Sequence, residues 1–373
     1  MIWNKRWIKR KRMIVLICIL LFVLMGYLCF SSYGVYIINS EDYRAEAIDA
    51  MSQRMDSLFL EMNNFPENEG NDMLYLGKMR GLNNLINSEG IEWEKDRKIL
   101  IDDFLIFMGA NSIYYQLRYI DEKGVEIVKV ERIGDDVYEV DGKDLQSKVD
   151  RYYFEETMKL DKEEIYISPL DLNIKNDVVE NRGTKENPEY VPVIRYAMPV
   201  FDNSGKAKGI LILNVYADYF LEDVRRLRGD GELSFLVDSD GYYLAHSNKS
   251  KEFSFMFGGK SGIVDDYPEE GRDILKGFDR RNLESENYIF SFRHVYPSVG
   301  MFEIYQGSRK LFGEKPEEEY YWVLVSVADR DIVEKKINGA RSRFFVFVLF
   351  SILIILIILI LLFIILVMNG NLK

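Results

Sequence analysis

The chain has 373 residues, a formal net charge of −12 and two cysteines. Because an acidic surface repels the phosphate backbone, a nucleic acid is excluded as the partner. Both Cys18 and Cys29 lie in one apolar stretch, so the remaining chain cannot be a disulfide scaffold and must depend on a hydrophobic core.

Two apolar stretches predict two transmembrane helices. Residues 13–38 contain no charge, and residues 344–368 are apolar except for Ser351. With a rise of about 1.5 Å per residue, each can cross a hydrocarbon core of about 30 Å. Six cations and no acid precede the first stretch: Lys5, Arg6, Lys9, Arg10, Lys11 and Arg12. The positive-inside rule therefore predicts both ends in the cytoplasm.

Two observations bear on this topology. Four cations precede the second stretch and oppose the predicted orientation: Lys335, Lys336, Arg341 and Arg343. A cleaved signal peptide is the alternative for the first stretch, but the residues after Leu28 offer no typical cleavage site, so an uncleaved anchor is expected.

The chain is expected to fall into eight parts. These are a cytoplasmic basic segment (1–12), a first span (13–38), a stalk helix (39–65), a membrane-distal unit (66–228), a membrane-proximal unit (229–330), a helix into the membrane (331–343), a second span (344–368) and a cytoplasmic tail (369–373).

The stalk carries a heptad seam. Its apolar residues recur at spacings of three and four: Ile48, Met51, Met55, Leu58 and Met62. Such a seam predicts either a dimer stalk or a helix packed on its own sheet, and both remain open. Pro66 and the residues before it are expected to interrupt the helix, with helical patterns resuming at 73–86 and 93–108.

Three hairpins follow, each with a turn that begins with Asp and ends with Gly. The turns are at 121–124, 202–205 and 238–241, between strands at 114–120 and 125–130, 193–201 and 209–215, and 233–237 and 242–245. The repeated pattern predicts two units of similar build, joined near 228–231. A last strand is expected at 322–327.

The sequence contains no recognisable set of catalytic or metal-binding residues. His246 and His294 have no second His or Cys nearby, and no G-x-S-x-G motif is present. The segment 257–261 is similar to the end of a phosphate-binding loop, but Ser254 stands where the first glycine is needed. The turn at 238–241 begins like a calcium loop without its closing glutamate. No enzyme activity, cofactor or metal is therefore expected.

The segments 114–132, 150–160, 166–173 and 193–215 resemble the double Cache sensor domains. These are two PAS-like units on one long helix, found outside the membrane in prokaryotic histidine kinases and chemoreceptors. The resemblance implies a mixed α/β fold, in which each unit is an antiparallel sheet with flanking helices and the membrane-distal unit holds a ligand.

The resemblance also implies ligand-binding residues. Amino-acid-binding members carry R-x-W-Y, then Y-x-D, then an Asp near the end of the last strand. Arg151 and Tyr153 fall on the first motif and Tyr166 on the second, whereas Ser168 and Asn214 stand where the two aspartates belong. The two missing carboxylates would pair with an amino group, so a carboxylate or another small polar molecule is expected instead of an amino acid.

Two further arginines, Arg118 and Arg195, lie on predicted strands in which apolar and polar residues alternate. Their side chains face either the same cavity or water. Only residues 369–373 follow the second span, so a separate histidine kinase or chemoreceptor is the expected partner. The sequence thus predicts a homodimeric, two-pass plasma-membrane sensor with its main domain outside the cytoplasm. The alternatives are a receptor that captures a solute without signalling, or a structural surface protein.

Overall fold

The computed structural model describes residues 2–229, 231–277, 281–297 and 320–371, with some side chains of the terminal helices left out. They form two compact units. The first holds α1 (Ile2–Gly77) as far as Met51, residues 286–289, and the chain from Ala328 through α9 (Arg330–Asn371). The second holds the described parts of 52–285 and 290–327.

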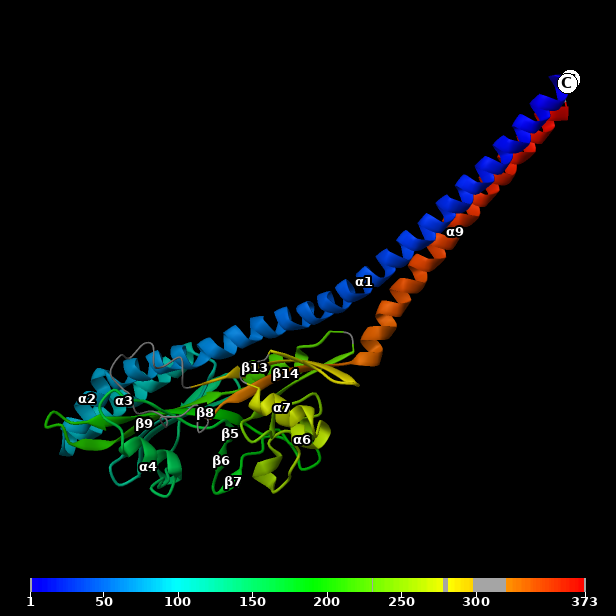
Figure 1. Ribbon diagram of the computed structural model, residues 1–373. Coiled ribbons are helices and arrows are strands. Elements are labelled where there is room, and N and C mark those ends of the chain that lie inside the picture. The colour runs from blue at the N-terminus through cyan, green and yellow to red at the C-terminus, as the bar shows by residue number, and fades with distance from the viewer. Residues whose placement is uncertain (1, 230, 278–280, 298–319, 372–373) are drawn as a thin grey trace. The chain divides into compact units, whose positions relative to one another are not determined.

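In the first unit, α1 and α9 lie side by side (Figure 1). Arg44 on α1 forms an ion pair of 3.0 Å with Glu334 on α9. Among the residues that the structure describes, no helix has both the length and the apolar character needed to cross a membrane. Many side chains of 13–38 and 344–368 lie outside the described residues, so the two predicted spans stay predictions.

In the second unit, the remainder of α1 packs on its own chain. Met55, Leu58 and Met62 of the heptad seam are buried in the main core. The helix is not interrupted at residues 63–66, as the sequence led us to expect, but continues through Pro66 to Gly77. Phe65 is buried before the proline and Met73 after it, and this packing offsets the cost of about 3 kcal/mol of a proline inside a helix.

Two helices and a large sheet follow. The helices are α2 (Arg80–Asn87) and α3 (Gly90–Ala110). The sheet has seven strands in the order β3-β2-β1-β9-β8-β4, with β5 also paired to β8. The strands are β1 (Tyr114–Asp121), β2 (Glu126–Ile133), β3 (Asp136–Glu139), β4 (Tyr166–Ile167), β5 (Asp171–Leu172), β8 (Pro192–Phe201) and β9 (Ala207–Tyr216). Between them lie α4 (Tyr152–Met158) and the small hairpin of β6 (Ile174–Lys175) and β7 (Val178–Val179).

A second sheet has five strands in the order β11-β10-β14-β13-β12. The strands are β10 (Glu232–Asp238), β11 (Tyr243–Ala245), β12 (Asn282–Glu284), β13 (Tyr288–Val295) and β14 (Trp322–Asp329). The helix α5 (Asp218–Arg226) precedes it, and α6 (Ile263–Asp266) and α7 (Glu270–Lys276) lie between its strands in sequence. The mixed α/β fold with a long N-terminal helix and two antiparallel sheets is confirmed, whereas the predicted unit boundaries stay predictions.

The three predicted hairpins are confirmed as β1–β2, β8–β9 and β10–β11. One carboxylate oxygen of each turn aspartate accepts hydrogen bonds of 2.8–3.0 Å from the amides two and four residues later; these are Asp121, Asp202 and Asp238. The glycine that closes each turn has a φ between 79° and 88°, a conformation that other residues rarely adopt. The Asp-to-Gly spacing therefore specifies the turn directly.

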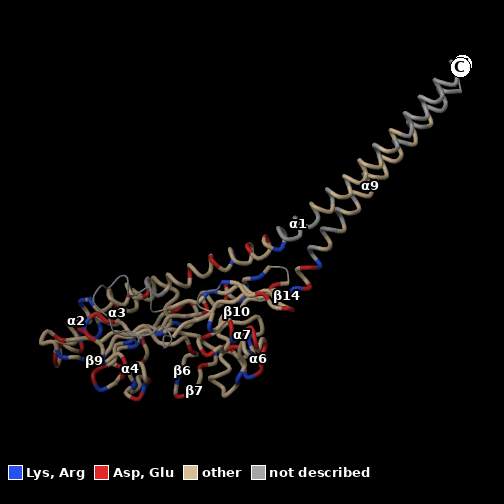
Figure 2. The backbone as a smooth tube through the Cα atoms, viewed as in Figure 1, with Lys and Arg blue, Asp and Glu red and all other residues tan. Residues whose placement is uncertain are grey.

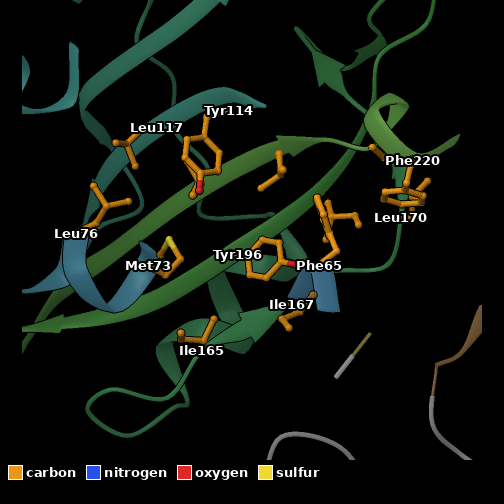
Figure 3. Close-up of a cluster of buried hydrophobic side chains, with 14 of the residues drawn as sticks. Phe65, Met73, Leu76, Tyr114, Leu117, Ile165, Ile167, Leu170, Tyr196 and Phe220 are labelled. Atoms are coloured by element: carbon orange, nitrogen blue, oxygen red, sulfur yellow. The ribbon is translucent and has the colours of Figure 1, made fainter. Parts of the chain in front are cut away.

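The helices α1, α2 and α3 cover one face of the large sheet (Figure 1). Figure 3 shows part of this core, where Tyr114 and Leu117 from β1 and Tyr196 from β8 lie among side chains of α1. Because side chains alternate along a strand, only every second residue of each strand points to this face. The intervening residues point to the opposite face.

Candidate ligand-binding site

The opposite face of the large sheet is buried but polar. Strand register places Arg195 opposite Asn214, Asn214 opposite Gln116, and Gln116 opposite Glu131. The neighbouring row runs from Ala197 through Ile212 and Arg118 to Lys129. The six polar members of these rows are each at most 6% exposed: Gln116, Arg118, Lys129, Glu131, Arg195 and Asn214. We call this set the polar rows.

An apolar cluster beside the polar rows involves α4. Tyr153 and Phe154 of α4 pack with Tyr166 of β4 and with Ile210 and Ile212 of β9. Burying a polar group without a hydrogen-bond partner costs free energy. The polar rows, buried next to this apolar cluster, therefore need hydrogen bonds within the protein or to a bound molecule.

Arg118 is the centre of the polar rows. Its Nη2 donates to Asn214 Oδ1 at 2.8 Å and its Nη1 to Glu126 Oε1 at 3.3 Å. Its Nε is buried and has no hydrogen-bond partner. Lys129 stands directly opposite it on β2, and like charges in that position repel each other. Arg118 and Lys129 are each paired with one acid, Glu126 at 3.3 Å and Glu131 at 3.4 Å, so any surplus of positive charge here comes from neighbouring lysines.

Lys148 adds a third cation to Arg118 and Lys129. Its Nζ donates to Gln146 Oε1 at 2.5 Å, and the residue is 6% exposed. Burial, followed by repulsion from Arg118, lowers the pKa of Lys148 to about 8. Burial likewise lowers the pKa of Lys129. Burial is the main cause of both shifts, so an anionic ligand, which would give these buried ammonium groups a partner, would oppose them.

The second acid near this region, Glu131, is already engaged. It lies 3.4 Å from Lys129 Nζ and 2.9 Å from Lys175 Nζ. Burial alone would raise the pKa of Glu131, but these two lysines hold that pKa below its usual range. Glu131 therefore neutralises Lys175 as well as Lys129 and leaves the charge of Arg118 to Glu126 alone.

Arg195 has closer polar partners within the protein than Arg118. Its Nη1 lies 2.5 Å from Asp171 Oδ1, and its backbone amide donates to Ser168 Oγ at 2.9 Å. The ring of Tyr153 lies 5.7 Å from the guanidinium carbon of Arg195 and 5.8 Å from that of Arg118. Tyr153 is therefore an aromatic wall between the two arginines.

Arg151 lies at the edge of the site. Its Nη2 forms an ion pair of 2.6 Å with Asp177, at the tip of the β6–β7 hairpin. Both residues line a cavity of about 480 Å³ together with Gln146, Lys148 and Asn176. Lys148 lines this cavity and also feels the charges of Arg118 and Lys129, so the cavity adjoins the polar rows.

The structure brings together most of the residues predicted from sequence. Arg118, Asn214, Tyr153, Arg195 and Ser168 are joined by the contacts above. Tyr166 is buried in the apolar cluster with Tyr153, whereas Arg151 is separate and bonded to Asp177. Their roles as ligand contacts stay predictions.

Sequence reasoning missed Lys129, Glu126, Lys148 and Asp171. A regular register that continues the pairing of Ile120 with Glu126 would place Val128 opposite Arg118. A bulge between Tyr119 and Ile120 shifts the register by one residue and places Lys129 there instead. The alternation of charged and apolar residues at 128–131 was the available signal, but it does not reveal the bulge.

The smaller sheet differs in character. Phe235 and Tyr243 contact each other edge to face at 5.2 Å, and Tyr243 lies 4.8 Å from the ring of His246. His246 is 5% exposed, as expected for a packed histidine. The interior at these positions is filled by aromatic rings, which makes the larger sheet the candidate ligand site.

Residues 77–268, more than half of the chain, match the family described as bacterial histidine kinase, sensor domain. The chain belongs to this family. No curated protein matches the chain by sequence. The predicted resemblance to double Cache sensor domains is thereby confirmed.

Solved structures of other sensor domains share the fold of this family member. The extracellular domain of vpHK1S-Z8, named as a histidine kinase, is 18% identical with a TM-score of 0.61, covering 80% of this chain and 96% of its own. A domain of a sensory box/GGDEF family protein from Vibrio parahaemolyticus is also 18% identical with a TM-score of 0.61, covering 79% and 99%. Methyl-accepting chemotaxis protein X is 11% identical with a TM-score of 0.50, covering 77% and 99%.

Proposed function

We propose that this chain is a membrane-anchored, extracytoplasmic sensor that binds a small carboxylate on the polar rows and passes the change to a separate signalling partner. The observation that carries the proposal is the setting of Arg118. Its Nε is buried without a partner, and a second cation, Lys129, stands directly opposite. A carboxylate would accept from the guanidinium and reduce the repulsion between the two cations.

The surroundings favour an anion that lacks an amino group. Ser168 and Asn214 are neutral, and their hydrogen-bonding groups are used within the protein. The carboxylates at the site are already paired, Asp171 with Arg195 at 2.5 Å and Glu126 with Arg118 at 3.3 Å. An ammonium group would therefore have to displace one of these pairs or lie beside the cations, and both cost free energy.

Membrane attachment is supported by the two apolar stretches. Phe22 and Phe30 on α1 are 75% and 78% exposed, and Val346 and Phe350 on α9 are 62% and 63% exposed. Figure 2 shows no Lys, Arg, Asp or Glu in the described parts of 13–38 and 344–368. Large apolar surfaces on soluble helices are unfavourable, and a bilayer would cover them.

Signal relay is supported by α1, which is one continuous helix from Ile2 to Gly77 and whose later turns pack on the large sheet. A displacement of that sheet can therefore bear on the helix that leaves the sensor domain. We propose that a homodimer of this chain acts on a histidine kinase or chemoreceptor in this way, without catalysis of its own.

The test is thermal unfolding of the full chain in a mild detergent with carboxylates, amino acids, amines and sugars. A ligand at 100 times its Kd adds about 2.7 kcal/mol, which raises the Tm by about 4–5 °C for a domain of this size. We expect carboxylates to give this shift, and Arg118→Gln and Lys129→Gln to abolish it. The matched control is Arg226→Gln, since Arg226 is 75% exposed on α5 and should leave the shift unchanged.

Three outcomes would contradict the proposal in different ways. A shift with amino acids alone would refute the carboxylate. A carboxylate shift without any change in cross-linking of the exposed Cys29 between chains would favour a receptor that only captures a solute. Silence across the panel would favour a structural role.

A further inference from the structure

Glu69 is a carboxylic acid buried in the apolar core between α1 and the large sheet. It is 3% exposed, and its Oε2 is buried without a hydrogen-bond partner. Figure 3 shows Tyr114 and Tyr196 of the sheet in this core, with Phe65 and Met73 of α1, the residues that bracket Glu69 in sequence. This core lies on the face of the sheet opposite to the polar rows.

The surroundings of Glu69 favour its protonated form. The Tyr114 hydroxyl donates its only hydrogen to Asp72 Oδ2. Glu69 lies close enough to this hydroxyl for the two groups to influence each other's pKa. A carboxylate at Glu69 would therefore leave a charged Oε2 buried without a donor, whereas the protonated acid carries no charge.

The groups that face Glu69 come from three elements. Asp72 is on α1 itself, Tyr114 is on β1 and Tyr196 is on β8. Burial raises the pKa of Glu69 to about 7, the Tyr114 hydroxyl opposes this rise, and the Asp72 charge adds to it. The Tyr196 hydroxyl is buried without a partner, so it does not stabilise a second negative charge.

We propose that Glu69 is a proton-dependent contact between α1 and the large sheet. While the carboxyl is protonated, α1 packs on the sheet; when it ionises near neutral pH, residues 62–77 loosen from the sheet. The proton dissociates from the Glu69 carboxyl to solvent when the segment opens. The sensor thereby has an acidity input on the helix face, separate from the proposed ligand site.

Hydrogen–deuterium exchange of the full chain in detergent tests this directly. Peptides covering residues 62–77 are followed at pH 6 and pH 8, with labelling times scaled for the intrinsic exchange rate. A carboxyl whose pKa falls from about 7 when packed to 4.5 when exposed makes opening about tenfold more frequent at pH 8 than at pH 6. In Glu69→Gln the opening frequency should be the same at both values.

Three variants separate this mechanism from a general loss of packing. Asp72→Asn removes the charge that raises the Glu69 pKa and should move the midpoint of the transition to lower pH. Tyr196→Phe should leave the pH dependence unchanged, and Glu69→Met should abolish it if the glutamine variant does not fold. Equal protection at both pH values in the wild type would overturn the proposal, as would a tenfold change that persists in Glu69→Gln or Glu69→Met.

Discussion

The buried pair of Arg195 and Asp171 allows a quantitative test of how the polar rows are held. Their side chains are 5% and 17% exposed and lie 2.5 Å apart. In Asp171→Leu, Arg195 keeps the Tyr152 hydroxyl at 3.5 Å and the Tyr153 ring at 5.7 Å, but no carboxylate. Removing one partner of a buried pair costs about 3–5 kcal/mol, and the partial exposure of Asp171 places the expectation at about 3 kcal/mol.

The double variant Asp171→Leu/Arg195→Met removes both charges together. Replacing both members of a buried pair by apolar residues is often neutral, so the double variant should lie within about 1 kcal/mol of the wild type. The matched control is Asp177→Asn, which breaks the pair with Arg151. Asp177 is 91% exposed, and exposed pairs contribute about 0–1 kcal/mol.

Urea unfolding followed by tryptophan fluorescence, to which Trp322 contributes from the core at 1% exposed, measures these changes. A loss of about 3 kcal/mol also corresponds to a Tm lower by about 5 °C for a domain of this size. The reasoning would be refuted if Asp171→Leu cost less than about 1 kcal/mol, or if the double variant were less stable than Asp171→Leu.

Three further predictions concern the core and the polar rows. Phe104→Ala on α3 should cost about 3–5 kcal/mol because this side chain is 0% exposed, whereas Ile106→Ala on the same helix, at 73% exposed, should cost less than about 0.5 kcal/mol in urea unfolding. Asn214→Leu should cost about 1–3 kcal/mol, since it leaves Arg118 without its 2.8 Å acceptor; a neutral effect would contradict the network. The pKa of Lys148 is about 8 when folded and 10.5 when unfolded, so the unfolded chain binds more protons between these values and the free energy of unfolding should rise with pH from 8 to 10. Lys148→Met should flatten that rise, and an unchanged slope would show that Lys148 is not buried.

The hairpins were predictable because each turn is encoded locally. An aspartate whose carboxylate caps two later amides, followed three residues on by a glycine with positive φ, fixes the turn wherever it occurs. The continuation of α1 through Pro66 was not predictable. It depends on the burial of Phe65 and Met73 in a core that includes strands and helix α5, which come at least 40 residues later in the sequence.

Some residues of the candidate site were likewise predictable from the sequence, and others were not. Arg118, Arg195 and Asn214 could be proposed from strand alternation and from resemblance to a family. Lys129 could not be placed, because one bulge decides whether it or Val128 stands opposite Arg118. Asp171 lies three residues after Ser168, beyond the motif position, and only the fold shows that its carboxylate reaches Arg195.

The two faces of the large sheet share the same strands, and this gives a physical route from ligand to helix. On β1, Arg118 faces the polar rows, while its neighbours Leu117 and Tyr119 belong to the core beneath the helices. A ligand that relieves the repulsion between Arg118 and Lys129 would let β1 and β2 approach at that point. Because a close-packed core transmits small displacements, the packed residues on the other face of the sheet must move with the strands. We therefore expect a bound carboxylate to change the exchange protection of residues 52–77 at constant pH, and to do so equally in Glu69→Gln. A ligand that stabilises the fold without altering this protection would show that binding at the polar rows does not reach α1.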